Sequence, residues 1–127
     1  MDPWVHIIGG GLSGLSLAAS LAQFKKLPGQ VVISEPNSRS LAAKTFSFWY
    51  TDSERPFLSP EYSSSRWTLS SGDDHVSHHG NRFGYGTRSG NHVLESALNS
   101  IDHHPQIDLV DELIHTRPKA THCFDSR

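Results

Sequence analysis

The chain has 127 residues, a formal net charge of −2 and a hydrophobic content of 35%, so it can form one small domain at most. This charge balance excludes a basic nucleic-acid groove, and the single cysteine, Cys123, excludes an internal disulfide and fits a reducing compartment. No signal peptide is recognisable and no run reaches the roughly 18–20 apolar residues of a membrane span, so we expect a cytoplasmic protein whose membrane association, if any, is peripheral.

The first predicted unit is a strand, a glycine turn and a helix. Val5–Ile8 is a continuous apolar run, as expected of a central parallel strand. Gly9, Gly11 and Gly14 then follow the spacing G-x-G-x-x-G, in which the first glycine permits the turn, the second lets a pyrophosphate approach the backbone, and the third allows close helix–strand packing. A helix predicted over residues 12–26 would direct its free N–H groups and positive dipole end at the phosphates.

A second apolar run, Val31–Ser34, is the next predicted strand, and it leads directly into Glu35. This acid lies about 20 residues beyond the last glycine, the usual offset for a carboxylate that binds an adenosine ribose. The same carboxylate would repel the 2′-phosphate of NADP, and the long excursion that follows favours FAD over NAD. The alternative is a buried strand-turn-helix that binds nothing, with Glu35 merely ending a strand.

Residues 39–90 are expected to form a β-rich segment inserted into the nucleotide-binding sheet. Segments 66–69 and 82–87 have the pattern of short strands, whereas 44–50 is either a short strand or a loop packed over a ligand. Two prolines exclude a central strand or a helix interior at 55–60. The aromatic residues of this segment form either the core of a small second sheet or the lining of an apolar tunnel.

Clustered histidines raise the question of a metal site. His75, His78 and His79 follow Asp73 and Asp74. Zinc, however, needs about four ligands, usually anchored from both sides of a fold, and no second cluster has a suitable spacing. We therefore predict a solvated loop here and no metal site.

The C-terminal part returns to the pattern of the first unit. Residues 92–101 have the apolar 3-4 spacing of a helix, with Asn91 as its predicted N-cap. Ile107–Val110 and residues 121–127 are the third and fourth predicted parallel strands. No helix is predicted to cover the last strand, so we expect a truncated domain.

These elements predict an α/β fold: a Rossmann-like FAD/NAD(P)-binding domain with an incomplete parallel sheet and an inserted β-rich excursion. Residues 1–38 and 91–127 would form the nucleotide-binding sheet, and residues 39–90 the insertion.

Several short segments resemble the lycopene cyclase family. In Lys44–Trp49 a polar residue and a threonine precede an aromatic-Ser-Phe triplet, as in bacterial members. Trp67–Leu69 is similar to the Trp-containing strand of the family, and residues 85–88 with 92–94 are similar to its Tyr-containing strand and the helix after it. Asp125–Arg127 resembles the turn after its fourth Rossmann strand.

The resemblance implies an FAD protein that uses NADPH to keep the flavin reduced and closes the ends of lycopene into β-ionone rings without net redox change. It implies six cofactor-binding residues: Gly9, Gly11 and Gly14 at the pyrophosphate, Glu35 at the adenosine ribose, and Asp125 and Arg127 towards the flavin. The acidic catalytic segment of the family has no counterpart here, so catalytic residues stay unassigned. An FAD-dependent monooxygenase or dehydrogenase fragment and a non-catalytic remnant stay open as alternatives.

Overall fold

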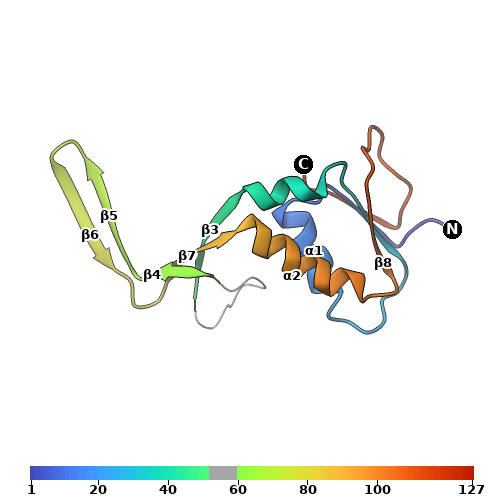
Figure 1. The fold of residues 1–127 in the computed structure, drawn as a ribbon, viewed down its shortest axis with the longest axis horizontal. Helices are drawn as coiled ribbons and strands as arrows, with labels where there is room; N and C mark the ends of the chain where they lie inside the picture. Colours follow the sequence, from blue (N-terminus) through green and yellow to red (C-terminus); the bar gives the residue numbers. More distant parts are fainter. Residues whose placement is uncertain (52–59) are drawn as a thin grey trace.

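A parallel sheet forms the centre of the fold in the computed structural model, which describes residues 1–51 and 60–127 (Figure 1). Its four strands lie in the order β8-β2-β1-β9 and are β1 (Val5–Ile8), β2 (Val31–Ser34), β8 (Ile107–Val110) and β9 (His122–Asp125). This is the order 3-2-1-4 of the first four strands in a doubly wound dinucleotide fold. The predicted α/β class with a parallel sheet is confirmed.

One face of this sheet packs against the helices α1 (Leu12–Leu21) and α2 (Gly90–Asp102), which also contact each other. Alternate strand residues face the helices, as the period of two in a strand requires. The buried residues on this face are Val5, Ile7, Val31, Ile33 and Ile107. Burial of such side chains contributes roughly 1.5–3 kcal/mol each, so this face is the main source of stability.

Helix α1 is shorter than predicted, because it ends at Leu21 and does not reach residue 26. Beyond Leu21 the side chain of Phe24 is 62% exposed and takes no part in the main core. The Phe24 carbonyl instead accepts a hydrogen bond of 2.7 Å from His104 Nε2. A tertiary contact therefore replaces the last predicted helical turn.

Helix α2 begins one residue before the predicted cap. Its N-cap is Ser89, whose Oγ accepts a hydrogen bond from the His92 N–H at 3.4 Å, and Asn91 lies inside the helix. The prediction of Asn91 as the cap was wrong, because serine and asparagine both cap well and local pattern does not separate them.

A 3-10 helix, η1 (Ser38–Ala43), was not predicted, and it packs against α2. It buries Leu41 in the main core. The Gly90 N–H donates a 2.6 Å hydrogen bond to the Lys44 carbonyl, which joins the end of η1 to the start of α2. A side chain at Gly90 would overlap the Leu41 carbonyl, so this contact needs a glycine.

A second sheet is antiparallel and has the order β3-β7-β4, with β3 (Thr45–Tyr50), β7 (Gly84–Ser89) and β4 (Tyr62–Ser64). Of the predicted segment 44–50, residues 45–50 are therefore a strand and not a loop, and Lys44 is the C-cap of η1. Two glycines of β7 leave room for aromatic rings of β3, since a Cβ at Gly84 would lie 2.6 Å from the Tyr50 ring. Of the predicted 55–60 segment, residues 55–59 lie outside the described residues.

The third sheet is a two-stranded hairpin, β5 (Arg66–Ser71) and β6 (Asp74–His79), that projects from the rest of the chain (Figure 1). The prediction of a solvated loop around the histidines was wrong, because these residues form β6. The two strands are joined by a two-residue turn, Gly72-Asp73. The φ of Gly72 is +59° and the φ of Asp73 is not positive, as in a type II′ hairpin turn. Glycine at the first position of such a turn is the sequence signal for this hairpin.

Residues 111–121 contain neither helix nor strand, and Glu112 of this segment contacts the sheet face opposite the helices. On that face the buried His6 Nε2 lies 2.8 Å from Ser34 Oγ, which donates a 3.4 Å hydrogen bond to Glu112. Burial lowers the pKa of His6, while the charge of Glu112 raises it. This connection therefore supplies a polar cover where a helix was absent.

Candidate functional site

Two of the three predicted glycines are required by the protein itself. Gly9 has φ +100°, which side-chain-bearing residues rarely adopt, and a Cβ there would lie 2.7 Å from Ser126 Oγ. A Cβ at Gly14 would overlap the Gly9 carbonyl, because the first turn of α1 rests on the end of β1. These are the turn and packing roles that the spacing predicts.

Gly11 differs from its neighbours, because in residues 1–51 and 60–127 no atom outside its own chain neighbours lies within 4 Å of the position a Cβ would take. Its backbone, with φ −78° and ψ −166°, is open to any residue. Gly11 is also the N-cap of α1, where no side chain caps the helix and the first turn carries no acid. The free end of the helix and its positive dipole therefore face open space, an arrangement that suits a phosphate.

The structure places Glu35 beside the glycine turn. Its Oε2 accepts a 2.7 Å hydrogen bond from the Gly10 N–H, and its Oε1 accepts one of 3.0 Å from the Asn37 N–H. A Cβ at Gly10 would lie 2.7 Å from the Cβ of Glu35. The carboxylate at the end of β2 and the turn after β1 thus form one continuous edge of the parallel sheet.

Ser126 belongs to this site, although it was not among the predicted residues. Its Oγ lies 3.0 Å from both the Ile8 and the Gly9 carbonyl oxygens, and its N–H donates a 2.9 Å hydrogen bond to Ile8. The signal was its place directly after the fourth parallel strand, because the carboxyl ends of parallel strands meet at one edge. Ser126 therefore ties the end of β9 to the glycine turn.

Asp125 and Arg127 form a forked ion pair. Arg127 Nη2 lies 2.7 Å from Asp125 Oδ2, its Nε donates to Oδ1 at 2.9 Å, and its Nη1 donates to the Ile114 carbonyl. With Ile8, Arg117 and Cys123 they line a cavity of about 220 Å³ at the ends of β1 and β9. The two predicted residues are thus brought together with Ser126, and their contact with a flavin stays a prediction.

This ion pair makes a prediction about titration. The Arg127 guanidinium holds the pKa of Asp125 at about 2, below its ordinary value of 3.8. Because the folded-state pKa is the lower one, the contribution of the pair to stability is present above pH 3.8 and is lost as the pH falls through about 2. An NMR titration of the Asp125 carboxyl carbon should show that midpoint, and Arg127→Gln should return it towards 3.8. An unchanged midpoint in the variant would refute the pairing.

No group of three or more His, Cys, Asp or Glu side chains within residues 1–51 and 60–127 is arranged to hold a metal ion. Within those same residues, no helix has both the length and the apolar character needed to cross a membrane.

Comparisons with known proteins leave the family open. No protein-family model matches the chain, and a search of curated proteins returned no match. The functional interpretation therefore depends on the glycine turn, Glu35 and the neighbouring end of β9.

Proposed function

We propose that this chain is the FAD-binding portion of a flavoprotein related to the lycopene cyclases. The observation that carries the proposal is Gly11, which no protein atom requires to be glycine and which stands at the uncapped N-terminus of α1. A backbone position kept open towards a helix N-terminus is what a bound pyrophosphate needs.

The surrounding residues fit the adenosine half of FAD. The pyrophosphate would lie against Gly11 and the N-terminus of α1, and the carboxylate of Glu35 would accept hydrogen bonds from the ribose hydroxyls. Glu35 already accepts from Gly10, so binding orders no new side chain on that side. The bound flavin would supply the redox centre, while this chain would bind and orient the dinucleotide.

The family part of the proposal extends to substrate and reductant. The aromatic-Ser-Phe segment that carries the resemblance forms strand β3, which follows η1 and pairs with β7 in the second sheet. On this proposal NADPH keeps the flavin reduced, and the protein contributes to redox-neutral cyclisation of lycopene ends to β-ionone rings. Catalytic residues are not assigned in this chain.

Titration of the purified chain with FAD, followed by quenching of flavin fluorescence, tests the cofactor. We expect stoichiometric binding by the wild type and at least a hundredfold loss in Gly11→Val. The variant should stay folded, because its side chain points into open space and an unfavourable N-cap costs about 1 kcal/mol.

Gly72→Asn is the matched control. Its Cβ also has no neighbour within 4 Å, but it lies at the tip of the distant hairpin, and asparagine tolerates positive φ. Failure of the folded wild type to bind FAD would refute the cofactor, and full binding by Gly11→Val would refute its location. Titration of the FAD-loaded chain with lycopene in detergent tests the proposed relation to the lycopene cyclases. An unchanged flavin spectrum would contradict that relation.

A further inference from the structure

A second cavity lies at the base of the β5–β6 hairpin, apart from the glycine turn. Its volume is about 520 Å³, within the range of roughly 300–1,000 Å³ typical of small-molecule sites. Besides Gly80, its lining residues are Trp49, Trp67, His78, Asn81, Arg82 and Phe83. The cavity therefore joins the end of strand β3 to the hairpin and to the loop before β7.

Aromatic rings form the wall of this cavity. Trp49 and Trp67 meet edge to face with their centroids 4.8 Å apart, and His78 lies 4.7 Å from Trp67. Gly80 allows this arrangement, since a Cβ there would lie 2.7 Å from the Trp67 ring. Trp49 is nevertheless 54% exposed and Phe83 46% exposed. Covering these rings with an apolar ligand would be favourable, because aromatic side chains contribute most when they are buried.

The charge of the lining is positive. Among the residues that the structure describes, Arg82 is the one lining residue with a permanent charge, and no aspartate or glutamate lines the cavity. Its guanidinium carbon lies 5.5 Å from the centroid of the Phe83 ring, on the aromatic wall. In the described part of the chain, neither salt bridge involves Arg82.

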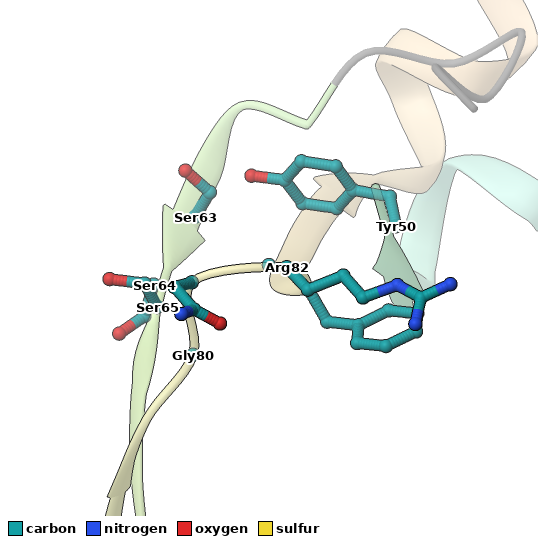
Figure 2. A pocket seen from close by; sticks show the side chains of 9 residues that line it. Tyr50, Ser63, Ser64, Ser65, Gly80 and Arg82 are labelled. Atoms are coloured by element: carbon teal, nitrogen blue, oxygen red, sulfur yellow. The ribbon is translucent and has the colours of Figure 1, made fainter. Parts of the chain in front are cut away.

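Arg82 also borders a smaller polar cavity of about 260 Å³, lined by Tyr50 and by Ser63, Ser64 and Ser65. Figure 2 shows that the Tyr50 hydroxyl points towards Ser63, whereas the side chain of Arg82 extends away from the three serines. The guanidinium is therefore not directed at the hydroxyl groups of that cavity.

We propose that the cavity at the hairpin base binds an apolar monocarboxylate. The hydrocarbon body would pack on Trp49 and Trp67, and the carboxylate would pair with the Arg82 guanidinium and the Asn81 amide. A cationic ligand is disfavoured because Arg82 would repel it, and a neutral hydrocarbon would desolvate Arg82 without pairing it. This inference is independent of FAD binding, since it uses no residue of the glycine turn.

Three probes with the same twelve-carbon tail and different head groups test the proposal: dodecanoate, dodecanol and dodecyltrimethylammonium. Binding is measured by calorimetry, with the two ionic probes below their micellar concentrations and dodecanol below its solubility limit. We expect dodecanoate to bind roughly tenfold or more tighter than dodecanol, the gain of a charge-assisted hydrogen bond. Arg82→Gln should reduce the affinity for dodecanoate to that for dodecanol. Trp67→Ala should weaken the binding of both.

Arg66→Gln is the matched control, because Arg66 lies at the start of β5, near the base of the hairpin, but donates to His79 Nδ1 at 2.9 Å and does not line the cavity. It should leave the preference for dodecanoate unchanged. Tighter binding of the ammonium probe, a preference that survives Arg82→Gln, or no binding by a folded wild type would each overturn the proposal. Retained far-ultraviolet circular dichroism and a cooperative thermal transition in each variant separate lost binding from lost folding.

Discussion

Replacing Gly14 with alanine is expected to lower the free energy of unfolding by about 2 kcal/mol or more. In an ordinary exposed helix this substitution would stabilise by about 1 kcal/mol, because alanine is the better helix former. Here the new methyl group would overlap the Gly9 carbonyl, and overpacking costs typically 1–3 kcal/mol and occasionally more. Backbone atoms cannot rotate away as a side chain can, so we expect the overlap to outweigh the propensity gain.

Thermal unfolding followed by far-ultraviolet circular dichroism measures this effect, and we expect the melting temperature to fall by about 5–10 °C. Gly11→Ala, three residues earlier, is the control, because its Cβ would have no neighbour within 4 Å. Its cost should stay below about 1 kcal/mol. A stabilised Gly14→Ala variant would show that α1 does not rest on the end of β1.

Gly90→Ala is the second substitution for which we expect a large loss, again about 2 kcal/mol or more. Gly90 starts α2, and a methyl group there would overlap the Leu41 carbonyl and lie 2.7 Å from the Lys44 carbonyl. Relief would require η1 to move away from α2, and Leu41 is only 3% exposed in the core. The overlap would therefore be transmitted to the main core.

Denaturant unfolding measures the loss at Gly90, with Asn91→Ala as the neighbouring control. Asn91 is exposed, and the contact of its side-chain amide with Glu95 is a long one of 3.4 Å. That control should change the free energy of unfolding by no more than about 0.5 kcal/mol. Equal denaturant midpoints for Gly90→Ala and Asn91→Ala would mean that the close contact between Gly90 and the Leu41 carbonyl is not required for stability.

The first βαβ unit was predictable from sequence because its signals are local. The apolar run before Gly9 forms β1, the three glycines lie in the turn and at the start of α1, and Glu35 directly follows β2. Each signal is therefore adjacent to the element that it predicts. Prediction was weaker at β6, where the histidines suggested a solvated loop. There the sequence signal was the Gly72-Asp73 turn. Strand β6 forms by pairing with β5 on the other side of that turn.

Other features arose only in the folded chain. Just beyond the end of α1, a hydrogen bond joins Phe24 to His104, which are 80 residues apart in sequence. The contact between Ser126 and the glycine turn spans 117 residues. Patterns within a short window cannot report such pairs, because they exist only after the parallel strands have been placed side by side.

Local pattern was enough to predict that a strand, a glycine turn and a helix begin this protein, and that an acid follows the second strand. Which glycines the protein itself requires followed only from the packing of the folded chain. Gly9 and Gly14 are explained by backbone conformation and packing, whereas Gly11 faces open space. A glycine motif in the sequence shows only where side chains are missing. Whether a side chain would fit there depends on the atoms that surround the position, and these come from segments that are distant in sequence.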